Sequence, residues 1–130
     1  FYAGDILNEG KFNKGQIRFL NNLDQFLKII CNAEKALLKA PDDYSIGIAP
    51  HSLRAIPLEF LREIDNIRSK GPVHIHVAEQ LKEVEIIKSK FGSRPVEWLL
   101  NNININYRWC LIHATHMTQV ETKTLEKPIL

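Results

Sequence analysis

The sequence predicts an α/β fold of parallel strands and covering helices, amounting to about half of an eight-stranded, TIM-type (β/α)8 barrel. Strand-like and helix-like segments alternate with a period of about 30 residues, the length of a β-α unit. The strand segments are apolar, as in parallel sheets covered by helices. A complete barrel usually has about 250 residues. We therefore expect one partial barrel domain over residues 1–130, incomplete at both ends, with a four-stranded doubly wound domain as the competing architecture.

The first part of the chain predicts two strand segments separated by a long helix. Residues 1–3 have the pattern of the end of an apolar strand, and a polar loop follows over residues 4–16. The run 44–49 is rich in β-forming residues, is bounded by Pro50, and predicts a strand. Between them, the range 22–39 predicts a helix because apolar side chains recur at intervals of three and four, at Leu23, Phe26, Leu27, Ile30, Leu37 and Leu38.

The middle of the chain predicts a helix, a strand and another helix. Pro57 has the position of a first-turn proline, and apolar residues at i, i+3 spacing predict a helix that ends at Gly71. Residues 73–77 predict a strand. Residues 81–91 place apolar side chains on one helical face, and Gly92 ends that helix. The charged side chains of this helix are expected to form a solvated face, at Lys82, Glu83, Glu85 and Lys88.

The last part of the chain repeats the alternation. A short helix is predicted over residues 94–101, and an apolar run over residues 109–112 predicts a strand. The segment 117–127 is amphipathic and predicts a helix that Pro128 ends. With the stub at the start of the chain, the sequence contains four strand segments, which is half the number in the barrel.

Composition and charge exclude several classes of protein. Seventeen basic residues against fifteen acidic ones give a net charge of +2 without a block of like charges, so no nucleic-acid partner is expected. No apolar run reaches the roughly 20 residues of a membrane span, and no signal-peptide pattern opens the chain, so we expect a cytoplasmic protein without a membrane partner. Cys31 and Cys110 lie in apolar surroundings and are interpreted as buried thiols in a reducing compartment.

All five histidines lie within or just after the second half of a predicted strand. Sites in β/α barrels and open α/β sheets form at the carboxyl ends of the strands, from several consecutive loops. Three strands therefore deliver imidazole groups to the same rim, where a small-molecule substrate would bind. The five are His51, His74, His76, His113 and His116.

The segment from His74 to Glu79 carries the strongest local motif. Strand alternation places His74 and His76 on one face, which is the barrel interior, and Glu79 lies in the following loop. Neutral imidazole suits zinc or iron, and a carboxylate three residues later can move the proton of a metal-activated water without binding the metal. Alternatively, the histidines are hydrogen-bonded core residues.

Two further segments have both a functional and a structural interpretation. His113 ends a strand and can point to the reaction centre or pack structurally, whereas for His116 we favour a structural role in the loop. Arg54, three residues after His51, is suited to holding a carboxylate through its two-pronged guanidinium group. Alternatively, this loop only leads into a helix, with Ser52 as a cap and Arg54 solvated.

Three segments together resemble the amidohydrolase superfamily of metal-dependent deaminases, and most closely its N-formimino-L-glutamate iminohydrolase branch: residues 47–54, 74–80 and 108–116. Residues 16–19 and 94–100 are also similar to that branch. The resemblance implies hydrolysis of N-formimino-L-glutamate to N-formyl-L-glutamate and ammonia, a step of histidine degradation. The related guanine and S-adenosylhomocysteine deaminases share the His-x-x-Glu pattern and the later His but generally lack the Pro-His-Ser-Leu-Arg loop, and remain an alternative.

The resemblance also implies roles for individual residues. His76, on the fifth barrel strand, would bind zinc, or another divalent metal such as iron, and Glu79 would be the proton shuttle. His113, on the sixth strand, would position or polarise the water and the substrate. His51 and Arg54, after the fourth strand, would bind the carboxylates of the glutamate moiety. The chain would then span barrel strands three to six.

The resemblance also implies parts that this sequence does not contain. The zinc site of the family uses a His-x-His pair on the first strand and an aspartate on the eighth, and neither segment is present. We therefore expect the 130-residue chain alone to be inactive and to bind zinc weakly at best. A half-barrel exposes two sheet edges, so association into a homo-oligomer, most simply a homodimer, is expected. A catalytically dead half-barrel that serves as an oligomerising module is the alternative from a different class.

Overall fold

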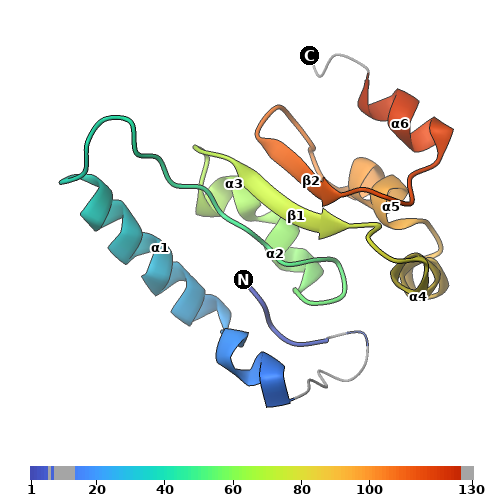
Figure 1. Cartoon of the computed structure of the whole chain (residues 1–130), viewed down its shortest axis with the longest axis horizontal. Helices are drawn as coiled ribbons and strands as arrows, with labels where there is room; N and C mark the ends of the chain where they lie inside the picture. The colour runs from blue at the N-terminus through green and yellow to red at the C-terminus, as the bar shows by residue number, and fades with distance from the viewer. Residues whose placement is uncertain (6, 8–13, 127–130) are drawn as a thin grey trace.

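The computed structural model describes residues 1–5, 7 and 14–126, and its elements alternate along the chain as the sequence predicts (Figure 1). In chain order they are the 3-10 helix η2 (Lys14–Phe19), α1 (Leu23–Leu37), α2 (Leu58–Arg62), α3 (Ile64–Ile67), β1 (Val73–Val77), α4 (Leu81–Phe91), α5 (Pro95–Asn102), β2 (Trp109–His113) and α6 (Gln119–Leu125). In the described part of the chain, no helix is both long and apolar enough to cross a membrane.

The two strands β1 and β2 pair in parallel, with Val73 opposite Trp109 and Val77 opposite His113. On the other side of β1, Ile48 forms a parallel bridge with Val73. The order in space is therefore the segment around Ile48, then β1, then β2, which is also their order along the chain. The α/β alternation and the parallel pairing that the sequence predicts are confirmed.

The predicted strand over residues 44–49 is reduced to that single bridge. The Ile48 N–H donates to the Pro72 carbonyl at 2.9 Å, and the Ile48 carbonyl accepts from the His74 N–H at 3.0 Å. Pro50, which is next in line, has no N–H to continue the ladder, and the His76 N–H instead reaches the His51 carbonyl at 3.0 Å. The predicted strand stub at residues 1–3 is likewise not a regular strand. It lies beside this segment, with the His51 N–H donating to the Phe1 carbonyl at 2.9 Å.

The helices follow the predicted pattern with one break and small shifts of their ends. Asn22 caps α1 through a reciprocal pair of hydrogen bonds with Gln25, each 2.9 Å long. The helix predicted from Pro57 onward is divided into α2 and α3 at Glu63, whose backbone (φ −92°, ψ 3°) leaves the helical region. Gly92 ends α4 in the left-handed conformation (φ 76°), as predicted. The predicted end of the last helix, residues 127 and 128, lies outside the described residues, as does part of the predicted loop 4–16.

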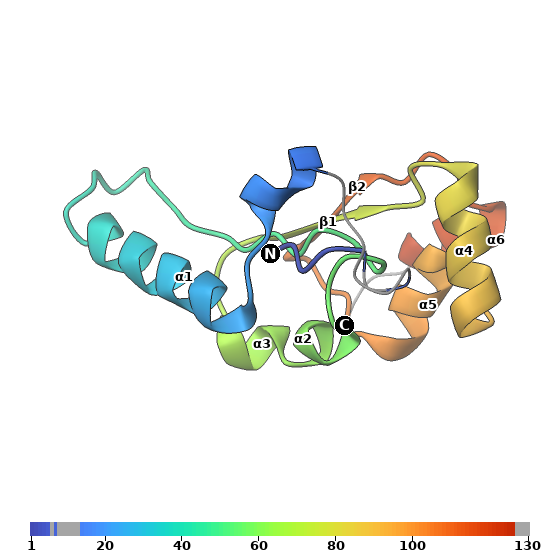
Figure 2. The same cartoon turned by 90° about the horizontal axis from the view of Figure 1, so that it is seen from below.

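Strand alternation divides the sheet into two different faces. Val73, Ile75 and Val77 are buried on the face that the helices cover. The core on that side includes residues of α2 to α5, among them Leu61, Ile64, Val84, Ile87, Val96 and Leu99. Figure 2 shows α2 and α3 on this side of the strands and η2 on the other. One covered face and one open face is the arrangement expected for part of a barrel wall.

Both cysteines are exposed, so their predicted burial is wrong. Cys110 pairs in register with His74 and therefore lies on the strand face that the helices leave uncovered. Cys31 lies on α1, where Phe26 is the buried side chain. Figure 1 shows α1 extending along one edge of the molecule. An apolar neighbourhood in sequence does not bury a side chain when its face of the strand or helix has no partner in the fold.

Two glycines with the same backbone conformation give a matched test of the fold. Gly71 (φ +79°) lies against the Ile46 carbonyl, and a Cβ there would collide with that backbone oxygen, whereas a Cβ on Gly92 (φ +76°) would meet nothing within 4 Å. We expect Gly92→Ala to lower the free energy of unfolding by about 1–2 kcal/mol, the cost of the left-handed conformation. Gly71→Ala should lower it further, as measured by urea unfolding. Equal losses would contradict the close packing of residue 46 against residue 71.

Candidate functional site

Three histidines form a row across the carboxyl ends of the adjacent segments. The ring centroids of His51 and His76 are 5.0 Å apart, and those of His76 and His113 are 5.5 Å apart. Each ring comes from a different segment of the parallel array, so the row follows from the strand order. The convergence of imidazole groups on one rim, which the sequence predicts, is present.

Glu79 approaches this row from the loop after β1. Its Oε1 atom lies 3.7 Å from Nε2 of His113, and the two side chains are 46% and 40% exposed. Both groups therefore remain accessible to a small molecule on the open face. A carboxylate beside an imidazole is a pair that can accept and deliver protons.

The hydrogen bonding of His76 determines which of its ring nitrogens is free. Its Nδ1 atom lies 3.0 Å from the His51 carbonyl oxygen. Because a carbonyl only accepts hydrogen bonds, Nδ1 must carry the proton, so that in the neutral ring the lone pair of Nε2 is left available. A backbone carbonyl holding the other ring nitrogen is the usual support of a metal-binding histidine. His76 is therefore prepared to provide one metal ligand.

The described residues do not complete a metal site. Among them, no three His, Cys, Asp or Glu side chains come together in a group that could hold an ion. Three protein ligands are usual for catalytic zinc. The chain thus fits a metal through His76 and would need further ligands from elsewhere.

An open cavity of about 680 Å³ lies on the uncovered face beside the row. Its lining includes His74, so the two strand histidines share a face as predicted. Other lining residues are Phe1, Tyr2, Gln16, Phe19, Asn21, His51, His76 and Ile112. Sequence reasoning missed Tyr2, whose ring centroid is 4.9 Å from that of His51. The only sequence signal for Tyr2 is its position in the predicted strand stub at residues 1–3, which lies beside residues 49–51 in the structure.

Burial, together with the nearby His76 and Arg54, lowers the pKa of His51 to about 4. His51 is therefore neutral near pH 7 and can act as a hydrogen-bonding group, with its Nδ1 atom 3.0 Å from the Ser52 hydroxyl oxygen. Arg54 is partly buried and is not among the described residues that line the cavity. Its charge nevertheless acts on His51. Of the two residues predicted to hold carboxylates, Arg54 is the one that is charged.

The solvated face predicted for the helix after β1 is wrong at Glu83. This side chain is buried and accepts hydrogen bonds from the backbone N–H groups of Ala78 and Glu79. The other charged residues of that face, Lys82, Glu85 and Lys88, are exposed as predicted. The signal that separates Glu83 from them is its spacing of four residues from Glu79, just after a strand end.

The loop after β2 begins in a strained conformation. His113 (φ 67°) and Ala114 (φ 49°) both lie in the left-handed region, which costs a residue with a Cβ about 1–2 kcal/mol. Hydrogen bonds to the loop after β1 hold the turn, from the Ala114 N–H to the Val77 carbonyl and from the His116 N–H to the Ala78 carbonyl, each at 3.0 Å. His116 therefore contributes through its backbone, in agreement with the structural role favoured for it.

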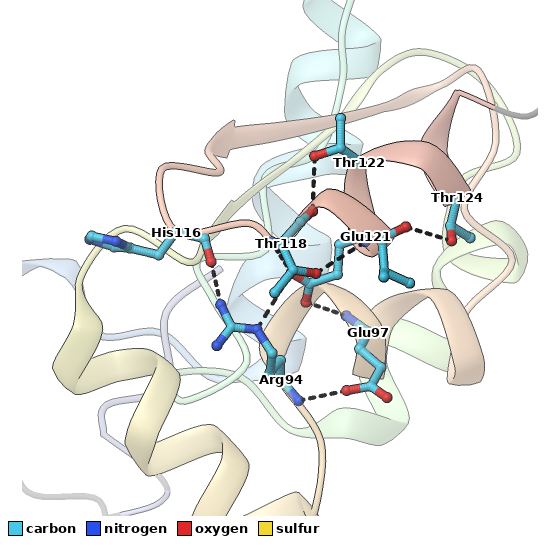
Figure 3. Close-up of polar contacts among 8 residues, drawn as sticks. Arg94, Glu97, His116, Thr118, Glu121, Thr122 and Thr124 are labelled. Carbon is cyan, nitrogen blue, oxygen red and sulfur yellow. Dashed lines mark hydrogen bonds and ion pairs between the residues drawn. The ribbon is translucent and has the colours of Figure 1, made fainter.

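A buried carboxylate fixes the far end of the same loop (Figure 3). Glu121, whose side chain is 6% exposed, accepts from the Thr118 N–H at 2.7 Å and from the Glu97 N–H at 3.2 Å. Arg94 lies 3.5 Å from this carboxylate and also donates to the His116 carbonyl. These contacts of Glu121 and Arg94 connect α5, α6 and the loop after β2. They restrict the path of the chain between His113 and α6.

Proteins similar to this chain are deaminases and amidohydrolases. Formimidoylglutamate deiminase of Pseudomonas aeruginosa is 36% identical over an alignment of 119 residues, and the match covers 88% of this chain and 25% of the relative. A 5-methylthioadenosine/S-adenosylhomocysteine deaminase of Carboxydothermus hydrogenoformans is 30% identical over 72% of this chain and 22% of its own length. The crystal structure of an amidohydrolase from Brucella melitensis superposes with a TM-score of 0.87 and 45% identity, over 96% of this chain and 28% of that one. No family model matches. The chain thus spans about a quarter of the length of these relatives.

The carboxylate of Glu121 generates a test of the loop support. In Glu121→Gln, the amide group faces one of the two backbone N–H groups with its own N–H₂ and leaves Arg94 without its charged partner. We expect the free energy of unfolding to fall by about 1–3 kcal/mol, the cost of leaving buried polar groups unpaired. The matched control is Glu126→Gln on the exposed end of α6, which should change it by less than about 0.5 kcal/mol. Equal effects in urea unfolding would refute the role given to Glu121.

Proposed function

The chain belongs to the amidohydrolase superfamily, and from this premise we propose that it supplies part of the site of a metal-dependent deaminase that hydrolyses N-formimino-L-glutamate. The products would be N-formyl-L-glutamate and ammonia. Because the chain spans about a quarter of its relatives, the whole site needs residues outside it. Its cytoplasmic location and homodimeric state stay predictions.

One observation supports the proposed chemistry above the others. The free Nε2 atom of His76 and the Glu79–His113 pair, 3.7 Å apart, lie on the same rim of the parallel strands. This arrangement combines one prepared metal ligand with a carboxylate and an imidazole that can handle protons. Metal-assisted hydrolysis of a C–N bond uses groups of these kinds near the reacting carbon.

The metal in this proposal is zinc, with iron as another divalent ion that imidazole accommodates. His76 would hold it through Nε2, together with ligands from outside the chain. When bound, such an ion supplies Lewis acidity and makes water reactive near neutral pH. The Nδ1–H bond from His76 to the His51 carbonyl keeps the ring in the required orientation.

Glu79 and His113 would handle the proton and the polarity of the reacting group. Glu79 Oε1 would take a proton from the attacking water and deliver it to the nitrogen that leaves as ammonia. His113 Nε2, close to that carboxylate, would hydrogen-bond the water or the formimino nitrogen. The 46% exposure of Glu79 leaves its carboxylate open to the substrate.

Arg54 and His51 would hold the far end of the substrate. The guanidinium group would provide the charge for a carboxylate of the glutamate moiety, and neutral His51 would add a hydrogen bond. The guanidinium charge favours a dicarboxylate. The rings of Phe1, Tyr2 and Phe19 in the cavity lining are of the kind on which a purine would stack, so purine deaminases are the rival class.

Glu79→Gln tests the proton shuttle in the full-length protein that contains this chain. Gln has the size of Glu and can hydrogen-bond, but it cannot accept and redeliver a proton. We expect kcat for N-formimino-L-glutamate, measured by ammonia release, to fall by about 100- to 10,000-fold with KM little changed. The exposed Glu85→Gln is the control and should leave both constants unchanged. Near-normal kcat in Glu79→Gln would end the assignment.

Arg54→Met tests the substrate class. Losing a charge-assisted hydrogen bond to a group that does not change during the reaction removes mainly uniform binding, about 1.5–3 kcal/mol. We expect KM for N-formimino-L-glutamate to rise by about 10- to 150-fold with kcat within a few-fold of the original. The same assay with 5′-methylthioadenosine should show no turnover. Turnover of that purine nucleoside, unaffected by Arg54→Met, would favour the rival class of deaminase.

A further inference from the structure

Glu83 is a buried carboxylate beside the candidate site that the proposed chemistry does not use. It lies in the first turn of α4 with a relative exposure of 9%. Its Oε1 atom accepts from the Ala78 N–H at 3.0 Å and its Oε2 atom from the Glu79 N–H at 2.9 Å. Both oxygens are therefore engaged by two consecutive residues of the loop after β1, the second of which is Glu79 itself.

The position of Glu83 in α4 makes this contact unusual. Glu or Gln at the third helical position normally reaches back to the N–H of the N-cap residue. Three other helices follow that rule, with Gln25 bonding Asn22, Glu97 bonding Arg94 and Glu121 bonding Thr118. Glu83 occupies the same position, but its carboxylate reaches beyond its own N-cap residue, Gln80. It accepts hydrogen bonds from the two residues that precede Gln80. Its carboxylate is used to hold the loop.

The loop needs such support because Ala78 is in the left-handed conformation. Its φ of 50° is unfavourable for a residue with a Cβ, and its side chain is 1% exposed. The carbonyl of Ala78 is held from the other side by the His116 N–H at 3.0 Å. The peptide groups around Ala78 are therefore fixed on both sides, and the direction in which Glu79 leaves the backbone is fixed with them.

We propose that Glu83 is a positioning residue that aims the Glu79 carboxylate at the reaction centre through its two backbone hydrogen bonds. This inference rests on the proposed function, because it assigns Glu83 to the proton shuttle. Without the two bonds, Ala78 can relax toward the extended region, and the Glu79 carboxylate moves away from the 3.7 Å approach to His113. Small displacements of a catalytic group have large effects on rate.

The test compares Glu83→Gln with Glu85→Gln in the full-length protein. The amide of Gln offers one acceptor oxygen, so one of the two N–H groups would face a donor. We expect Glu83→Gln to lower kcat for N-formimino-L-glutamate by about 10- to 100-fold, as for groups that orient catalytic residues, with KM changed less than about threefold. Glu85, on the same helix but exposed, should have no effect on either constant.

A double mutant separates positioning from general damage to the fold. If Glu83 acts through Glu79, Glu83→Gln should lower kcat in the original protein but cause no further loss in the Glu79→Gln background. A structural defect would lower kcat by the same factor in both, and that result would overturn the inference. If Glu83→Gln does not fold, Glu83→Asp keeps the charge but is one methylene too short to reach both N–H groups, and the same comparison applies to it.

The outcomes distinguish this inference from the proposed function. A collapse of kcat in Glu79→Gln, together with a Glu83→Gln variant that behaves like Glu85→Gln, would overturn the positioning role and leave the shuttle intact. Normal kcat in Glu79→Gln would overturn both. A rise of KM in Glu83→Gln with unchanged kcat would also contradict the inference, because substrate binding is assigned to Arg54 and His51.

Discussion

The parallel register of β1 with its neighbours is the constraint on which the candidate site depends. Val73, Ile75 and Val77 are buried against the helices, so the alternating His74 and His76 must face the open side. A slip of one residue would exchange these two sets and bury the imidazoles. The packing of the apolar side chains of β1 into the core thus determines which face of the sheet the two histidines occupy. The free energy of that packing also fixes the orientation of His76.

Hydrogen bonds to backbone carbonyl and N–H groups hold several residues of the rim in place. The His51 carbonyl accepts from His76 Nδ1, so the break in the ladder at Pro50 is also what supplies a hydrogen-bond acceptor to the imidazole. Two buried carboxylates, Glu83 and Glu121, bind N–H groups that have no strand or helix partner. A loop whose N–H groups are bonded by a buried carboxylate can keep an unusual backbone conformation, because N–H groups that turn away from the sheet still have a hydrogen-bond acceptor.

The parts of the fold that the sequence predicts well are those set by local periodicity. β1 has the predicted bounds because its alternation is regular, and α4 ends at Gly92 because only glycine takes that conformation without strain. The division at Glu63, the single bridge at Ile48 and the exposure of Cys110 depend on contacts across the fold, or on their absence. A local pattern does not contain that information.

The candidate site was predictable for a similar reason. The three histidines lie at the carboxyl ends of three predicted strands, and parallel strands end at one edge, so their convergence needs only the topology. The predicted exposure of Glu83 is wrong because its period matches an exposed helical face, and only the fold of the loop brings the N–H groups of Ala78 and Glu79 to its carboxylate. The neutrality of His51 depends on burial and on the charges of its neighbours, which have no signature in the local sequence.

Because of the left-handed turn at His113 and Ala114, the effect of a substitution on the rim does not simply decrease with its distance from the rim. A glycine would relieve the conformation at either position, but at residue 113 it would also remove the imidazole. The turn is therefore held by contacts made elsewhere, down to α6. Substitutions in α6, which contains no histidine, would then affect the rim. The sensitivity of each position to substitution would follow the hydrogen bonds that connect it to the rim rather than its distance from the cavity.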